Sequence, residues 1–173
     1  MKSFLVTVFL FMMLQCLQPA EGGSKGKDNK FCSSTGYTYI RGLDVCIKFH
    51  NTNTSWTEAQ ATCVGENAKL VALTTLEKDV FMKDYVLQQK GASSSFWIGA
   101  VWQGGVNTNW QWVTGESVPG TYENWIPGEP SVGTEIIFPC ASYLTAQNGW
   151  YASLCNCRES QAYVSLCENQ EFN

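Results

Sequence analysis

The sequence has very little histidine, few charges and, after its first residues, no apolar run long enough to cross a membrane. His50 is the single histidine among 173 residues, and only 15% of the residues are charged. Hydrolysis by a nucleophile usually needs a base beside that nucleophile, and no such motif surrounds His50. We therefore expect no enzymatic activity. A net charge of −4 leaves no basic surface that would favour nucleic acid or anionic lipid.

The beginning of the chain has the pattern of a secretory signal. Lys2 is followed by an apolar run over 4–14, which is too short to span a membrane, and small residues suited to cleavage follow it. We expect a mature protein that is secreted and extracellular. The predicted segments are a signal peptide over 1–22, a short flexible leader over 23–30, one folded domain over 31–169 and a tail over 170–173.

Export changes what the cysteines indicate. In an oxidising compartment they are disulfide candidates before they are metal ligands. Zinc is not expected, because only one residue separates Cys155 from Cys157 and the chain has one histidine. The number left after cleavage is odd, so one thiol remains over, and the sequence alone allows many pairings. These cysteines are Cys32, Cys46, Cys63, Cys140, Cys155, Cys157 and Cys167.

The local patterns predict both helices and strands. Residues 37–49 alternate around a turn at Gly42 and indicate a hairpin. Trp56, Ala59 and Cys63 have helical spacing, with Thr54 or Ser55 as the N-cap.

Residues 69–86 predict a short strand that leads into a second helix. We interpret Thr74 to Glu77 as a capping box, with Val80, Phe81 and Tyr85 as the apolar stripe of this helix. From Gly91 onwards we expect strands joined by long loops, and we interpret 148–155 as a loop.

Several short motifs follow one another in a specific order. The chain resembles a C-type lectin-like domain over about Cys32 to Glu168, and is similar to secreted single-domain C-type lectins. The resemblance implies an α+β fold: two helices packed on small antiparallel sheets, a long loop region, and stapling by disulfides. The motifs are WTEAQATC (56–63), LVAL (70–73) with Glu77, FWIGA (96–100), WQWVTG (110–115), YENW (122–125), GEP (128–130) and CE (167–168).

The resemblance also implies a cysteine pairing, which is Cys32–Cys46, Cys63–Cys167 and Cys140–Cys155. Cys157 is the alternative partner of Cys140, because its distance from the last cysteine is closer to the family's usual distance. With Cys155 paired, Cys157 has no partner within the chain. We then expect it near the surface, where it would link two chains into a disulfide-bonded homodimer.

The resemblance further implies a sugar site. In sugar-binding members, calcium is bound by a Glu-Pro-Asn or Gln-Pro-Asp triplet, a later glutamate, and the Asn and Asp of a Trp-Asn-Asp motif. Glu129-Pro130-Ser131 matches the triplet here, and Glu135 matches the later glutamate. Tyr151 and Ala152 replace the Asn and Asp, so the carboxylates fall from three to two.

We therefore predict that calcium is bound weakly or not at all. Two carboxylates, Glu129 and Glu135, would give a site at or beyond the weak, ~millimolar end of calcium affinities. The family's auxiliary calcium site draws carboxylates from the segment after its Trp-Ile-Gly motif. From Tyr85 to Gly115 the chain has no Asp or Glu, so we expect no calcium at the auxiliary site.

The resulting hypothesis is a secreted carbohydrate-binding protein that acts in extracellular defence (innate immunity) or matrix. It would recognise glycans or glycoproteins through Glu129, Ser131, Glu135 and Tyr151. The alternative is a calcium-independent module that binds protein, matrix or mineral surfaces. Asn53 begins the chain's one sequon for N-linked glycosylation.

Overall fold

The computed structural model describes residues 27–91, 94–105, 109–131, 139–156 and 163–169. The helices are α2 (Lys27–Ser34), α3 (Trp56–Gly65) and α4 (Leu76–Lys90), and a 3-10 turn, η2, spans Thr145–Gln147. The strands are β1 (Thr38–Ile40), β2 (Val45–His50), β3 (Lys69–Leu70), β4 (Ser95–Trp102), β5 (Trp110–Trp112), β6 (Pro139–Leu144), β7 (Gly149–Leu154) and β8 (Tyr163–Asn169).

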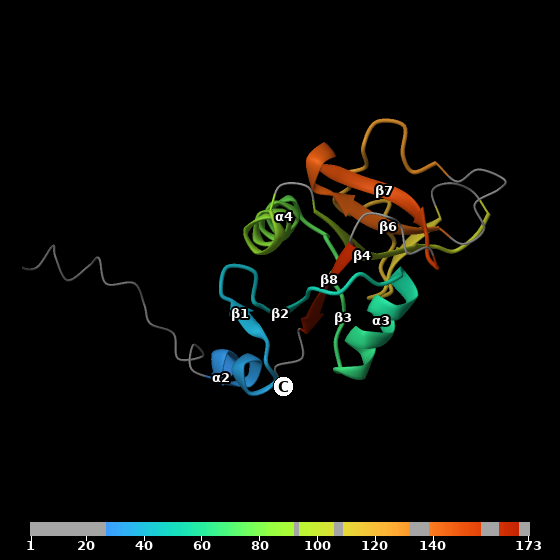
Figure 1. The fold of residues 1–173 in the computed structure, drawn as a ribbon. Helices are drawn as coiled ribbons and strands as arrows, with labels where there is room; N and C mark the ends of the chain where they lie inside the picture. Colours follow the sequence, from blue (N-terminus) through green and yellow to red (C-terminus); the bar gives the residue numbers. More distant parts are fainter. Residues whose placement is uncertain (1–26, 92–93, 106–108, 132–138, 157–162, 170–173) are drawn as a thin grey trace, which may run out of the picture.

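The strands form one mixed sheet in the order β1-β2-β8-β4-β6-β7, with β3 added to β8 and β5 added to β4. Every pairing is antiparallel except that of β4 with β8. Figure 1 shows the β1–β2 hairpin and α2 at the opposite end of the molecule from β6 and β7. The α+β fold class is confirmed, but the strands belong to one sheet rather than to several small ones.

The predicted signal peptide, leader and tail can be compared with the described residues at the ends of the chain. The predicted signal peptide over 1–22 and the tail over 170–173 lie outside the described residues. Helix α2 begins at Lys27, inside the segment predicted as a flexible leader, and it adds a helix to the two that we expected. No helix in the described ranges is both long enough and apolar enough to cross a membrane.

The predicted first helix is confirmed as α3. Ser55 is its N-cap: the Ser55 hydroxyl accepts from the Glu58 amide, and the Glu58 carboxylate accepts from the Ser55 amide at 2.9 Å. This reciprocal capping box satisfies two backbone donors that would otherwise lack partners. Trp56, Ala59 and Cys63 form the buried face of the helix, as their spacing predicts.

The second helix, α4, differs from its prediction. Its N-cap is Thr75 rather than Thr74, and the Thr75 hydroxyl accepts from the Lys78 amide. The predicted apolar stripe is confirmed only in part: Phe81 and Tyr85 are partly buried against the main core, whereas Val80 is 41% exposed. The buried face is Lys78, Asp79, Met82 and Val86.

Two charged residues lie on the buried face of α4 because each has a partner that is distant in the sequence. The ammonium of Lys78 pairs with the carboxylate of Glu168 on β8, and both side chains are almost fully buried. Asp79 accepts hydrogen bonds from residues of β6 and β7. A charge can be buried when it is paired or hydrogen-bonded. Because of these contacts, the face of α4 that points to the interior differs from the face that its apolar residues predict.

Three disulfides link the described residues. They are Cys32–Cys46, Cys63–Cys167 and Cys140–Cys155, which is the pairing that the resemblance implies. Cys140 is bonded to Cys155, and Cys157 lies outside the described residues. Cys63–Cys167 closes a loop with a sequence separation of 104 and joins α3 to β8, so it restricts the unfolded chain the most.

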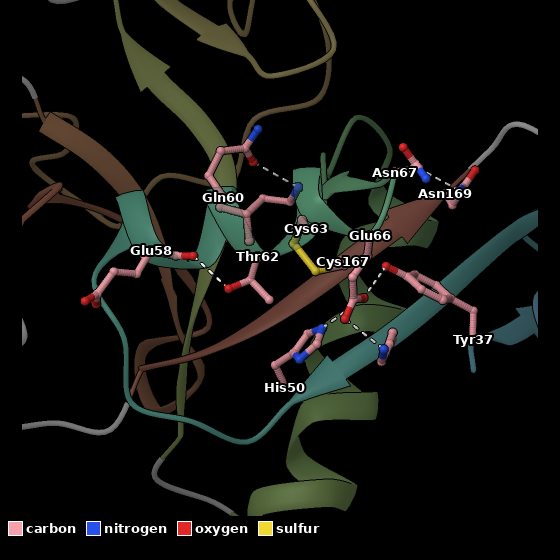
Figure 2. Close-up of a disulfide and its surroundings, with 12 residues drawn as sticks. Tyr37, His50, Glu58, Gln60, Thr62, Cys63, Glu66, Asn67, Cys167 and Asn169 are labelled. Atoms are coloured by element: carbon pink, nitrogen blue, oxygen red, sulfur yellow. Dashed lines mark hydrogen bonds and ion pairs between the residues drawn. A yellow bond between two sulfur atoms is a disulfide. The ribbon is translucent and has the colours of Figure 1, made fainter. Parts of the chain in front are cut away.

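A polar cluster lies beside the Cys63–Cys167 disulfide, and Figure 2 shows Glu66 between Tyr37 and His50. The Glu66 carboxylate accepts from Lys48 Nζ at 2.8 Å and from Tyr37 OH at 2.8 Å, and His50 Nε2 lies 3.4 Å away. Partial burial raises the pKa of Glu66, but these hydrogen bonds and the nearby charges outweigh it and lower the pKa overall.

The same cluster does not fit a metal ion. His50, Glu66 and Cys167 present possible ligand atoms within 4.8 Å of one another. However, the sulfur of Cys167 is bonded to Cys63, and the carboxylate of Glu66 already accepts from Lys48 and Tyr37. A metal would need a thiolate and a free carboxylate here. We therefore assign the cluster to stability.

We predict that Glu66→Gln lowers the free energy of unfolding by about 1 kcal/mol at pH 7, because the ionised carboxylate accepts two charge-favoured hydrogen bonds. A lowered pKa in the folded state stabilises the protein above the ordinary glutamate value of 4.5. The difference between wild type and variant should therefore shrink as the pH falls below that value. Guanidinium unfolding at pH 7 and at lower pH measures it. Exposed Glu116→Gln is the control, and an equal loss in both variants would contradict the assignment.

Candidate functional site

The candidate site forms where the segment 124–129 lies along strand β7. The Trp150 amide donates to the Asn124 carbonyl at 2.7 Å, and the Ile126 amide donates to the Trp150 carbonyl at 3.0 Å. On its other side β7 pairs with β6, from Gly149 opposite Leu144 to Leu154 opposite Pro139. The interpretation of 148–155 as a loop is therefore wrong, because most of it is a strand bonded on both edges.

Gly149 allows this close approach. A Cβ atom at this position would lie 2.7 Å from Ile126 Cγ2 and 2.9 Å from the Asn124 carbonyl oxygen. These distances are far below normal contact distances, so any other residue would push the segment 124–129 away from β7. The glycine thus fixes how near the segment and the strand come.

Glu129 reaches from this segment to the backbone of β7. Its Oε2 accepts from the Ala152 amide at 3.1 Å and from the Ser131 amide at 2.9 Å, and its Oε1 accepts from the Ser131 hydroxyl at 2.8 Å. The Glu129–Pro130 peptide bond is cis. Sequence analysis named Glu129 and Ser131 as site residues, and the structure brings them together beside Ala152.

Tyr151 and Ala152 face opposite ways on β7. Tyr151 is 36% exposed, whereas Ala152 is 3% exposed and belongs to the main core cluster. Alternation along a strand explains the difference. Tyr151, whose side chain is exposed, is thus the residue immediately before the one whose amide contacts Glu129. Glu135, the remaining predicted site residue, lies outside the described residues.

A buried aromatic cluster packs against β7 and the segment 124–129. Trp150 is fully buried, and its indole meets the rings of Trp112 at 5.3 Å, Trp125 at 5.5 Å and Tyr122 at 5.9 Å between centroids, all nearly perpendicular. Trp125 also packs on Trp110 at 4.8 Å. Edge-to-face pairs of this kind are energetically favourable, so they stabilise the position of the segment around Trp125.

Sequence reasoning missed Asp79, which lies beneath the same region. Its Oδ1 accepts from Trp150 Nε1 at 2.7 Å, and its Oδ2 accepts from Asn124 Nδ2 at 3.1 Å and from Tyr143 OH at 3.3 Å. Burial raises the pKa of Asp79, and the three donors oppose that rise. The only signal for Asp79 in the sequence is that it is a polar residue on what proves to be the buried face of α4. Because the predicted apolar stripe assigned that face to other residues, sequence reasoning did not identify Asp79.

The described donor set does not fit calcium. Calcium is bound by six to eight oxygens, with carboxylates as the main ligands. Three protein donors already occupy the Glu129 carboxylate. Tyr151 offers a neutral phenol, and the buried methyl group of Ala152 offers no oxygen. Among the described residues that match the family's calcium ligands, Glu129, Ser131 and the Ala152 amide therefore form a hydrogen-bonded cluster instead of an ion cage.

Comparison with known proteins places this fold. A family model described as the lectin C-type domain matches residues 52–169, and the chain belongs to this family, which is one of non-enzymatic carbohydrate-binding proteins. The chain is 36% identical over 117 residues to asialoglycoprotein receptor 1 of Rattus norvegicus, which covers 68% of this chain and 37% of the receptor. The first curated relatives are matched over only 25% to 37% of their own length.

Solved structures share the fold at lower identity. The Ca²⁺-independent C-type lectin SPL-2 from Saxidomus purpuratus has a TM-score of 0.63 and 23% identity, with 80% of this chain and 94% of that chain covered. SPL-1, solved as a complex with GlcNAc, has a TM-score of 0.61 and 23% identity, with 79% and 93% covered. The family therefore includes members described as independent of calcium.

We predict that isothermal calorimetry with calcium chloride detects no site tighter than about 1 mM, because the Glu129 carboxylate is occupied by protein donors. Glu129→Gln, which keeps the side chain's size and removes its charge, is the matched variant and should give the same weak heats. A saturable micromolar site that this variant abolishes would contradict the prediction.

Proposed function

We propose that this protein is a secreted lectin that binds glycans without needing calcium. The binding surface consists of Glu129, Ser131, Tyr151 and, from the sequence resemblance, Glu135. The observation that supports the proposal most directly is the occupied carboxylate of Glu129. A site stabilised by its own hydrogen bonds keeps its shape without an ion.

Ser131 supplies the polar contact in this proposal. Its hydroxyl has one proton, which is donated to Glu129 Oε1 at 2.8 Å, so its lone pairs remain as acceptors. Ser131 is exposed. A sugar hydroxyl can therefore donate to Ser131 Oγ, and the charge of Glu129 strengthens that acceptor through the shared hydrogen bond.

Tyr151 supplies the apolar contact. Sugars present C–H groups on one face of the ring, and an exposed aromatic side chain packs against such a face. The side chain of Tyr151 is exposed on β7, and Tyr151 precedes the residue whose amide donates to Glu129. Its hydroxyl adds one donor and one acceptor at the rim of the site.

Export is supported by the apolar run near the start of the sequence and by the disulfides, since such bonds persist in oxidising compartments. Asn53 is exposed, which suits the N-linked glycosylation expected there. Export would place the site where it meets extracellular glycans, consistent with a role in extracellular defence (innate immunity) or matrix.

A glycan array read with calcium and with a chelator tests the proposal, using the full mature chain. We expect equal binding in both conditions. We expect Tyr151→Ala to lower binding about tenfold, because an aromatic contact contributes roughly 0.5–1.5 kcal/mol beyond its buried area. Leu154→Ala, at a residue on the same strand that is 39% exposed, is the matched control and should bind like wild type.

Other array results would favour other functions. Binding that disappears with the chelator would favour a calcium-dependent lectin. No glycan binding in either condition, from a folded protein, would favour the alternative module that recognises protein, matrix or mineral surfaces.

We further propose that Cys157 links two chains into a homodimer. Cys155 is bonded to Cys140, which leaves Cys157 as the seventh cysteine of the exported chain. Linking two weak sugar sites would raise the overall avidity. On non-reducing gels we expect a dimer band for the secreted wild type and a monomer band for Cys157→Ser. A wild-type monomer would contradict the proposal.

A further inference from the structure

Asp79 differs from the other described carboxylates in its surroundings. It is 1% exposed, and the described contacts of its two oxygens are with three neutral donors rather than with a cation. Buried charges are costly unless they are fully hydrogen-bonded, so a carboxylate kept in this environment needs a reason beyond apolar packing. Its position in the first turn of α4 also favours negative charge through the helix dipole.

The three donors belong to three different parts of the fold. Trp150 is on β7, Tyr143 is on β6, and Asn124 is in the segment beside β7. Asn124 uses both of its amide hydrogens, one to Asp79 and one to the Asn148 carbonyl at 3.1 Å. The side chain of Asn124 therefore bridges the helix and the turn that precedes β7.

A continuous series of hydrogen bonds leads from Asp79 to Glu129. The Asn124 carbonyl accepts from Trp150, and the Trp150 carbonyl accepts from Ile126. The Ile126 carbonyl in turn accepts from the Glu129 amide at 2.9 Å. Glu129 finally contacts the Ala152 amide at 3.1 Å. Each bond fixes the next residue of the segment relative to β7.

We propose that Asp79 is a positioning residue for the glycan site: by binding Asn124 and Trp150 at once, it sets where Glu129 and Ser131 lie relative to Tyr151. This inference rests on the proposed function for its consequence in binding. The positional part concerns the protein alone and is measured separately.

The carboxylate, rather than the size of the side chain, is required. Two oxygens accept from Trp150 Nε1 on one side and from Asn124 Nδ2 on the other. In Asp79→Asn one oxygen becomes an NH₂ group, which places a donor against a donor at one of these two contacts. Either the indole or the segment must then move, although the volume of the side chain is unchanged.

The decisive variant is Asp79→Asn, with Asp84→Asn as the matched control. Asp84 is an exposed acid on the same helix, and its described ion pair is with neighbouring Lys83. In ¹H–¹⁵N spectra we expect Asp79→Asn to shift the Trp150 indole N–H and the Ala152 amide, whereas the amides of Ile47 and Leu70 stay in place. Asp84→Asn should leave all four signals unchanged.

Glycan binding is read on the same array in parallel. We expect Asp79→Asn to lower the signal about tenfold, the change that follows from losing one hydrogen bond to a charged group. An unchanged Ala152 amide signal would overturn the proposal, because the Trp150 indole contacts Asp79 directly and shifts in any case. Shifted signals with unchanged array binding would also overturn it, because Asp79 would then be structural only.

The test remains decisive if the Asp79→Asn variant does not fold and also if the wild type binds no glycan. If Asp79→Asn does not fold, Asn124→Ala removes the same contact from the segment's side, and an unmoved Ala152 amide would then overturn the proposal. If the wild type binds no glycan, the proposed function fails, and the Ala152 amide still decides whether Asp79 positions Glu129.

Discussion

The hydrogen bond from the Trp150 indole to Asp79 is 2.7 Å long, and with the bonds from Tyr143 and Asn124 to the same carboxylate it joins α4 to β6, to β7 and to the segment 124–129. The helix α4, the strand β7 and the aromatic cluster all meet at this one indole. Because the ring is fully buried, its N–H is favoured by an acceptor inside the protein, and the carboxylate of Asp79 is that acceptor. This bond helps to set the orientation of α4, together with the Lys78–Glu168 pair, and the position of the segment 124–129, together with its backbone bonds to β7.

Sequence reasoning predicted those elements whose signals are local. The hairpin β1–β2 follows from alternation and a turn, and α3 follows from a cap and a spacing. Sequence reasoning was only partly right on α4, where apolar periodicity selected Val80, which is exposed, and Phe81, which is partly buried against the core. The true inner face contains Lys78 and Asp79, whose partners Glu168 and Trp150 are 90 and 71 residues away. No local pattern contains a partner so distant.

The candidate site shows the same limit. The resemblance placed Glu129, Ser131 and Tyr151 at one site, and the structure brings the Glu129 carboxylate within 3.1 Å of the residue after Tyr151. The resemblance could not give the direction of the Glu129 carboxylate, because that depends on which backbone amides lie within reach. It also could not show that 149–154 is a strand, since the pairing needs both β6 and the segment 124–129.

In the glycan site that we propose, internal hydrogen bonds take the place of a bound ion, and this would change the kind of contact that the site offers to a ligand. A calcium ion attracts sugar hydroxyls with its full charge, whereas Ser131 Oγ and the Tyr151 phenol offer neutral acceptors and an apolar face. The Glu129 carboxylate already accepts hydrogen bonds from three donors within the protein. At the site that we propose, each sugar contact would compete with water on nearly equal terms, so we expect a single site to bind weakly. If calcium is not needed, as we propose, the shape of the site does not depend on calcium concentration. Useful affinity would then come from several sites that act together on one glycan surface.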